Sequence, residues 1–226
     1  MIEYQERRVA MVESQLRPNE VTDWGLLAAM RRLPRELFLP EKLRGFAYMD
    51  EDIEVWPASE ARAARFLLSP MVQAQLIQLA QIAAQDTVLD LGCATGYSTA
   101  ILAQLAARVV GVEPEPGLAE IADENLKALG LQNVDIVRRA FRDPPKDRGP
   151  YDAILVEGSV SAVPDVVLGQ LKEGGRLVAV LTEAPNMRQG KACIYLCVDG
   201  KARGVSLFDA GAAPLPGLAP EMAFAF

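Results

Sequence analysis

The residues best placed to do chemistry lie in one stretch, Val88–Ala100, which reads V-L-D-L-G-C-A-T-G-Y-S-T-A. Asp90 interrupts an apolar run, where an unpaired buried carboxylate costs free energy, and the glycines Gly92 and Gly96 follow. The residues from Tyr97 onward have the spacing of a helix. A buried strand, a glycine turn and a helix start let the backbone approach a ligand closely. The acid suits a ligand with an ammonium group and would repel pyrophosphate. The alternatives are a phosphate loop or a simple tight turn.

A second acid follows the next predicted strand. Arg108–Val112 reads R-V-V-G-V, and Glu113 comes directly after it. An acid about 20 residues beyond a glycine loop is the usual partner of ribose hydroxyls. Alternatively, Glu113 is a helix-start acid ahead of Pro114 and Pro116. The loop pattern, acid-x-Gly-x-(Gly/Ala)-x-Gly, resembles the first motif of class I S-adenosylmethionine-dependent methyltransferases. The resemblance implies S-adenosyl-L-methionine as cofactor, held by Asp90, Gly92, Ala94, Gly96 and Glu113.

Composition narrows the class of protein. A chain of 226 residues, 50% of them apolar, is long enough for one core with an attached lobe. The net charge of −7 argues against a nucleic-acid partner, because phosphate binding needs a basic surface. No apolar stretch reaches the length of a membrane span, and the N-terminus lacks a signal-peptide core, so we expect a cytoplasmic protein without a membrane partner. Histidine is absent and the three cysteines lack metal-ligand spacing, so we expect no metal site. The pattern specifies no oligomeric state.

Strands and helices alternate from Thr87 onward, which predicts a parallel sheet covered on both faces. The predicted strands are Val88–Leu91, Arg108–Val112, Val134–Val137, Ala153–Val156 and Leu177–Leu181, followed by a hairpin of Ala192–Val198 and Ala202–Phe208. We therefore predict an α/β fold with a doubly wound, mostly parallel, seven-stranded Rossmann-like sheet that ends in an antiparallel hairpin, similar to class I methyltransferases. The tail from Ala210 is expected to be an extended surface arm.

The residues ahead of this sheet predict helices and no parallel strand, with a looser stretch, Phe46–Arg65, that has no clear periodicity. Tyr4–Leu16 has apolar residues at helical spacing. Ser69 is a predicted N-cap for a helix that runs to about Ala84. We therefore divide the chain into a small helical lobe, residues 1–65, and a methyltransferase domain, residues 66–226.

Several stretches together resemble the protein-L-isoaspartate O-methyltransferase family. They are Met11–Leu16 (M-V-E-S-Q-L), Leu27–Met30, Pro34–Pro40 (P-R-E-L-F-L-P), Ala47–Asp50, Val88–Ala103, Val112–Glu113, Tyr151–Ile154, Val163–Pro164 and Gln170–Val178 (Q-L-K-E-G-G-R-L-V). These stretches occur in the family's order over roughly residues 9–180. The resemblance implies methyl transfer from S-adenosyl-L-methionine to the carboxylate of an isoaspartyl protein or peptide, with the lobe covering the acceptor site.

One segment departs from the family pattern on the acceptor side. The family carries G-x-G-Q-T-I-S-x-P, whose Thr and Ser face the acceptor carboxylate and the methyl donor. Ala63–Pro70 reads A-A-R-F-L-L-S-P, which puts Phe66 and Leu68 at those two positions. Ser69 comes one position later and is either a catalytic hydroxyl or a helix cap. This departure concerns the acceptor site and leaves the glycine loop unchanged.

A second departure concerns the adenine. After the third strand the family has G-D-G, whose Asp contacts the adenine, whereas this chain has Arg139, Ala140 and Phe141. We expect the adenine to be held by backbone amides at Ala140 and by an apolar contact from Phe141.

Glu157, at the carboxyl end of the predicted fourth strand, is the second catalytic candidate. Open α/β sheets bind ligands at that edge. A carboxylate acceptor is already ionised and needs no base, whereas a hydroxyl or amine needs one. Glu157 would repel the first and help the second; alternatively it is a solvated loop acid. Three hypotheses follow: an isoaspartyl methyltransferase, a methyltransferase for a small-molecule hydroxyl or amine with Glu157 as base or anchor, and a cofactor-binding member without turnover.

Overall fold

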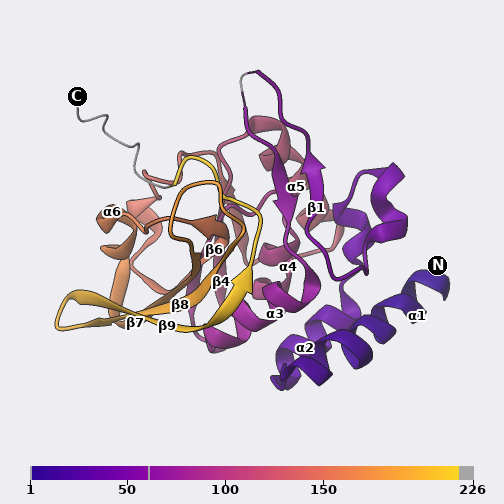
Figure 1. The fold of residues 1–226 in the computed structure, drawn as a ribbon, viewed down its shortest axis with the longest axis horizontal. Helices are drawn as coiled ribbons and strands as arrows, with labels where there is room; N and C mark the ends of the chain where they lie inside the picture. Colours follow the sequence, from indigo (N-terminus) through magenta and orange to yellow (C-terminus); the bar gives the residue numbers. More distant parts are fainter. Residues whose placement is uncertain (1, 61, 219–226) are drawn as a thin grey trace.

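The computed structural model describes residues 2–60 and 62–218. Within these residues, seven strands form the main sheet in the order β5-β4-β3-β6-β7-β8-β9 (Figure 1). The strands are β3 Thr87–Leu91, β4 Arg108–Val112, β5 Val134–Val137, β6 Tyr151–Val160, β7 Leu171–Leu181, β8 Gln189–Val198 and β9 Lys201–Gly211. Neighbours from β5 to β7 are parallel, whereas β8 is antiparallel to both β7 and β9. The predicted α/β fold with its C-terminal antiparallel hairpin is confirmed.

The parallel strands are buried on both faces. Val88, Leu89 and Leu91 of β3 have no exposed surface. Val88 packs in one apolar cluster and Leu89 in another, and successive side chains of a strand point to opposite faces. The two clusters therefore cover the two sides of the sheet, which is why a continuous apolar run suits this strand.

The helices of the described residues are α1 Ile2–Met11, α2 Trp24–Arg32, α3 Pro70–Leu79, α4 Tyr97–Ala103, α5 Pro116–Ala128 and α6 Asp165–Leu168, with short helical turns that include η3 Arg35–Phe38 and η4 Glu41–Phe46. Helix α3 ends earlier than predicted, because Gln81 adopts a φ of +48° and the Asp86 carboxylate accepts a hydrogen bond from the Ala83 N–H. Among the described residues, no helix is long and apolar enough to cross a membrane.

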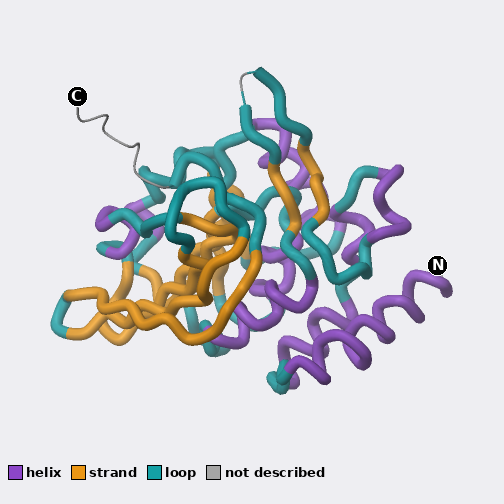
Figure 2. Tube along the Cα trace, viewed as in Figure 1, coloured by secondary structure: helices purple, strands orange, loops and turns teal. Residues whose placement is uncertain are grey.

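The N-terminal region also contains an antiparallel strand pair, which begins in the stretch Phe46–Arg65, where the sequence shows no clear periodicity. β1 Ile53–Trp56 and β2 Arg65–Leu67 form an antiparallel sheet that lies apart from the main sheet (Figure 2). Ile53 and Val55 are buried while Glu54 between them is exposed, which is the period-two pattern of a strand. β1 has only four residues and follows several acidic residues, so its alternating pattern is too short to be recognised in the sequence. The pair spans residue 65, where the lobe and the domain were divided.

The C-terminal segment does not form the predicted surface arm over its described residues. After β9, Ala212, Ala213 and Leu215 are buried. Ser159 of β6 holds them, since its N–H donates to the Ala213 carbonyl (2.9 Å) and its carbonyl accepts from the Leu215 N–H (2.9 Å). The rest of the tail, residues 219–226, lies outside the described residues.

Candidate functional site

The glycine loop joins β3 to α4 through left-handed backbone. Gly92, Ala94 and Gly96 have φ values of +93°, +48° and +95°. A Cβ on Gly92 would lie 2.7 Å from the Leu215 side chain, and one on Gly96 would lie 3.2 Å from the Cβ of Ala122. Glycine is therefore required for both conformation and space, as the sequence pattern indicates.

Asp90 lies fully buried beneath this loop. Its Oδ2 accepts hydrogen bonds from the hydroxyls of Ser98 (2.7 Å) and Thr99 (2.6 Å). Its Oδ1 is buried and has no partner within residues 2–60 and 62–218. Burial raises the pKa of Asp90 to about 6; the two hydroxyls oppose this shift and the charge of Glu113 adds to it. One carboxylate oxygen is thus free to accept a hydrogen bond from a ligand.

Glu113 is buried at the end of β4 and binds the same loop. Its Oε2 accepts from the Ala94 N–H (3.0 Å), and its Oε1 accepts from the Glu115 N–H (3.2 Å) and from Arg65 Nη1 (2.6 Å). Burial raises the pKa of Glu113, and the Arg65 charge opposes that shift. The structure therefore brings together all five residues expected at the loop: Asp90, Gly92, Ala94, Gly96 and Glu113.

Arg65 is a site residue that the sequence analysis missed. Besides its ion pair with Glu113, its Nη2 donates to the Gly92 carbonyl (3.1 Å), and its guanidinium lies 5.3 Å from the ring centroid of Phe141. The side chain is only 7% exposed. The available signal was a lone arginine in a largely apolar run, where the family pattern has glutamine. Arg65 therefore donates hydrogen bonds to two acceptors at the glycine loop, the Glu113 carboxylate and the Gly92 carbonyl.

The two residues expected near the adenine are placed differently. Phe141 is buried and lines a cavity of about 190 Å³ together with Trp56, Arg65 and Glu113. Ala140 is exposed, and its carbonyl accepts a hydrogen bond from the Asp143 N–H. Phe141 is thus near the ribose candidate Glu113, whereas Ala140 lies at the surface.

Glu157 is buried, which excludes the alternative of a solvated loop acid. Its Oε2 accepts a hydrogen bond from Gln73 Nε2 of α3 (3.0 Å). Burial raises the pKa of Glu157 well above its usual value and the Asp90 charge adds to this, whereas Gln73 and Arg35 oppose it. β6 continues past its predicted end, and the Glu157 side chain lies against Gln73 of α3.

Ser69, the other catalytic candidate, is the N-cap of α3. Its Oγ accepts a hydrogen bond from the Val72 N–H (3.4 Å), and its own N–H donates to Asp52 Oδ1 (2.8 Å). The predicted cap is confirmed. A catalytic role for the hydroxyl stays a prediction.

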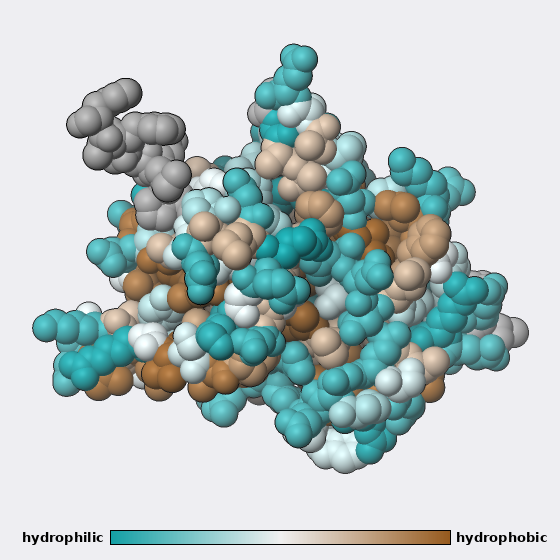
Figure 3. Space-filling model, viewed as in Figure 1, coloured by the Kyte–Doolittle hydropathy of each residue, from teal (hydrophilic) through white to brown (hydrophobic). Residues whose placement is uncertain are grey.

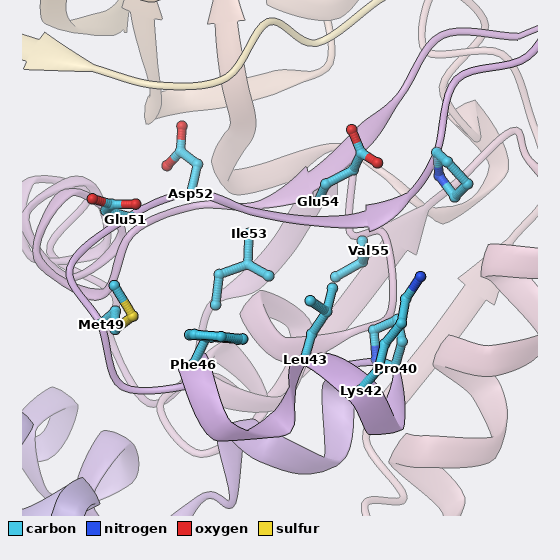
Figure 4. A pocket seen from close by; sticks show the side chains of 11 residues that line it. Pro40, Lys42, Leu43, Phe46, Met49, Glu51, Asp52, Ile53, Glu54 and Val55 are labelled. Carbon is cyan, nitrogen blue, oxygen red and sulfur yellow. The ribbon is translucent and has the colours of Figure 1, made fainter.

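A separate apolar cavity of about 460 Å³ lies between η4 and β1. Figure 4 shows Leu43, Phe46, Ile53 and Val55 pointing into it, and Figure 3 shows apolar surface in this part of the molecule. None of the loop residues lines this cavity. Its lining suits an apolar part of a ligand rather than the reacting atoms at the glycine loop.

The chain is similar to known proteins of one family. The sequence model of the family described as protein-L-isoaspartate(D-aspartate) O-methyltransferase (PCMT) matches residues 6–196. A protein-L-isoaspartate O-methyltransferase of Methanoculleus marisnigri is 38% identical over 172 residues, 76% of each chain. One from Rhodopseudomonas palustris is 39% identical over 168 residues, 74% of each chain.

Solved structures show the same fold. A protein-L-isoaspartate O-methyltransferase superposes with a TM-score of 0.80 at 25% identity, over 95% of this chain and 67% of the other. A putative one from Plasmodium falciparum, in complex with S-adenosyl-L-homocysteine, gives a TM-score of 0.72 at 20% identity, over 93% and 98% of the two chains. The chain therefore belongs to the protein-L-isoaspartate O-methyltransferase family and is a class I, S-adenosyl-L-methionine-dependent methyltransferase.

Proposed function

We propose that this enzyme methylates an isoaspartyl-type carboxylate of a protein or peptide, and that Glu157 in its protonated form donates a hydrogen bond to that carboxylate. The observation that carries the proposal is the position of Glu157, buried near the carboxyl end of β6 with one oxygen bonded to Gln73. Two relatives at 38% and 39% identity bear the isoaspartate name, which supports the acceptor class.

The residues at the glycine loop fit the cofactor. The unpartnered Asp90 Oδ1 is an acceptor for an ammonium group, and Glu113 is an acceptor for ribose hydroxyls once Arg65 releases it. Phe141 and its cavity are suited to the adenine side. When bound, S-adenosyl-L-methionine supplies a methyl group on a positively charged sulfur. The chain's own part is to position the acceptor and to exclude water.

A protonated Glu157 resolves the conflict between an acid and a carboxylate acceptor. The neutral form does not repel the acceptor, and its O–H offers a hydrogen bond that Phe66 and Leu68 cannot. Charged groups that act on Glu157 are Asp90 of β3, which favours the neutral form, and Arg35 of η3, which opposes it. The buried carboxyl thus takes the place of the family's hydroxyl groups.

A second candidate is methylation of a hydroxyl or amine with Glu157 as general base. The Gln73 N–H bond and the charge of Arg35 favour ionised Glu157, which such a base requires.

The pH profile with an isoaspartyl peptide separates the two candidates. We expect kcat/KM to fall as pH rises through the raised pKa of Glu157, because the donor is lost. Glu157→Gln keeps an N–H donor and should lower kcat/KM about fivefold and remove this fall. Glu157→Leu should cost about 30-fold, the loss of a hydrogen bond to a charged group worth about 2 kcal/mol. Near-complete loss in Glu157→Gln, with wild-type rates that rise with pH, would establish the base instead.

Titration calorimetry with S-adenosyl-L-homocysteine is the control for that experiment. Equal affinity in the wild type and both variants shows that the cofactor site is intact. Affinity without methylation of any carboxylate, hydroxyl or amine acceptor would leave the third hypothesis, a cofactor-binding member without turnover.

The domain division and the location are also proposals. We propose that residues 1–65 cover the acceptor side, since Arg35 of η3 reaches Gln73. The cysteines Cys93, Cys193 and Cys197 are free and buried, which supports a reducing, cytoplasmic environment.

A further inference from the structure

Arg35 of η3 is a fully buried cation held by neutral oxygen atoms. Its Nε donates to the Ala47 carbonyl (2.8 Å), its Nη2 to the Leu68 carbonyl (2.6 Å) and its Nη1 to Gln73 Oε1 (3.3 Å). The guanidinium also lies 4.7 Å from the ring centroid of Tyr97. Within the described part of the chain it forms no ion pair. Its surroundings therefore fix its position without neutralising it.

The chemistry of these groups gives the hydrogen bonds one direction. Arg35 has only donors, so the side-chain amide of Gln73 must turn its oxygen toward Arg35. The Gln73 nitrogen then faces Glu157, and because it too can only donate, Glu157 Oε2 must accept. When Glu157 is protonated, its proton is consequently left on the other oxygen.

We propose that Arg35 and Gln73 are positioning residues that make Glu157 present its O–H, rather than its C=O, to the acceptor carboxylate. This inference rests on the proposed function of Glu157 as a donor. The three residues come from η3, α3 and β6, so the N-terminal region determines which atom of a sheet residue meets the acceptor. The groups whose charges act on Glu157 are Asp90 and Arg35.

The sharpest test exchanges the two side chains in the double variant Gln73→Glu/Glu157→Gln. This variant keeps one amide and one carboxyl group but reverses the direction of the hydrogen bonds. A carboxylate at position 73 has only hydrogen-bond acceptors, so it accepts from the Arg35 guanidinium and must also accept from the side chain at position 157. The amide at position 157 must then turn its nitrogen inward and present its oxygen to the acceptor carboxylate.

We expect kcat/KM of this double variant with an isoaspartyl peptide to fall at least 30-fold below that of Glu157→Gln alone, mainly through a higher KM. Its affinity for S-adenosyl-L-homocysteine should match that of the single variant, and its melting temperature should be no lower, because the carboxylate at position 73 pairs with Arg35. Gln75→Glu on the same helix adds the same charge away from Glu157 and serves as the control. A double variant as active as Glu157→Gln would overturn the inference.

A titration that does not depend on turnover separates this inference from the proposed function. Carbon-13 NMR of the glutamate carboxyl groups, assigned with Glu157→Gln, follows the protonation of Glu157. Gln73→Met removes the N–H that favours the ionised form, so the midpoint for Glu157 should rise by at least half a pH unit. An unchanged midpoint would refute the positioning role. Loss of all activity in Glu157→Gln would instead refute the proposed function.

Discussion

The glycine loop and the region around Glu157 both contain a buried carboxyl group, but the chain builds them differently. Asp90 is held by Ser98 and Thr99, eight and nine residues away in the sequence. Glu157 is held by Gln73, 84 residues away, and Gln73 in turn by Arg35, 38 residues away. The first site follows from one local βα turn, whereas the second requires the N-terminal region to be packed on the sheet.

Arg65 is the strongest test of this contrast, because it is a distant residue in the otherwise local site, 48 positions from Glu113. Arg65→Ala leaves the buried Glu113 carboxylate without its ion-pair partner. The free energy of unfolding measured with urea should therefore fall by about 3 kcal/mol. Because Arg65 occupies acceptors that the ligand needs, calorimetry should also show a several-fold gain in affinity for S-adenosyl-L-homocysteine. Weaker binding would show that Arg65 remains a ligand contact.

The titration of Asp90 tests the glycine loop, the site that is built from residues close in sequence. Only ionised Asp90 can pair with an ammonium group, so affinity for S-adenosyl-L-homocysteine should fall about tenfold from pH 7 to pH 5, below the pKa of about 6. The unfolding free energy contributed by Asp90 should change the other way. Its pKa is raised above the unfolded value, so the folded state binds more protons and gains stability as pH falls from 6 toward 4.

Asp90→Asn should flatten both curves, and Asp135→Asn, at a half-exposed ion pair with Arg108, is the matched control. Affinity that stays constant between pH 7 and pH 5 in the wild type would contradict the assignment of Asp90 to the ammonium group.

The smallest expected effect is at Ser69, where two substitutions distinguish a role as helix N-cap from a role in catalysis. Ser69→Ala should lower the unfolding free energy by about 1 kcal/mol, because the Val72 N–H loses its acceptor. Ser69→Asp, which can cap but has no hydroxyl, should restore it. Restored stability without restored methylation would assign the hydroxyl to catalysis.

What the sequence predicts well is what neighbouring residues determine. The five strands of the βα part, the hairpin and the loop residues Asp90 to Gly96 come from short patterns, and all are confirmed as structure. Gln73 is one of three glutamines on α3, with Gln75 and Gln78, and nothing local distinguishes its buried amide from those of the other two. Arg65 and the buried tail were missed for the same reason. Their partners are other segments of the chain, which a pattern within one segment does not reveal.

The tail also bears on the order in which the enzyme is completed during synthesis. Leu215 lies against both Gly92 and Gly158 and is anchored by Ser159. The glycine loop leaves the ribosome more than a hundred residues before the side chain that covers it. Contacts between such distant positions form late, because the intervening chain must first be closed into a loop. A nascent chain therefore carries its glycine loop uncovered until Leu215 has been made.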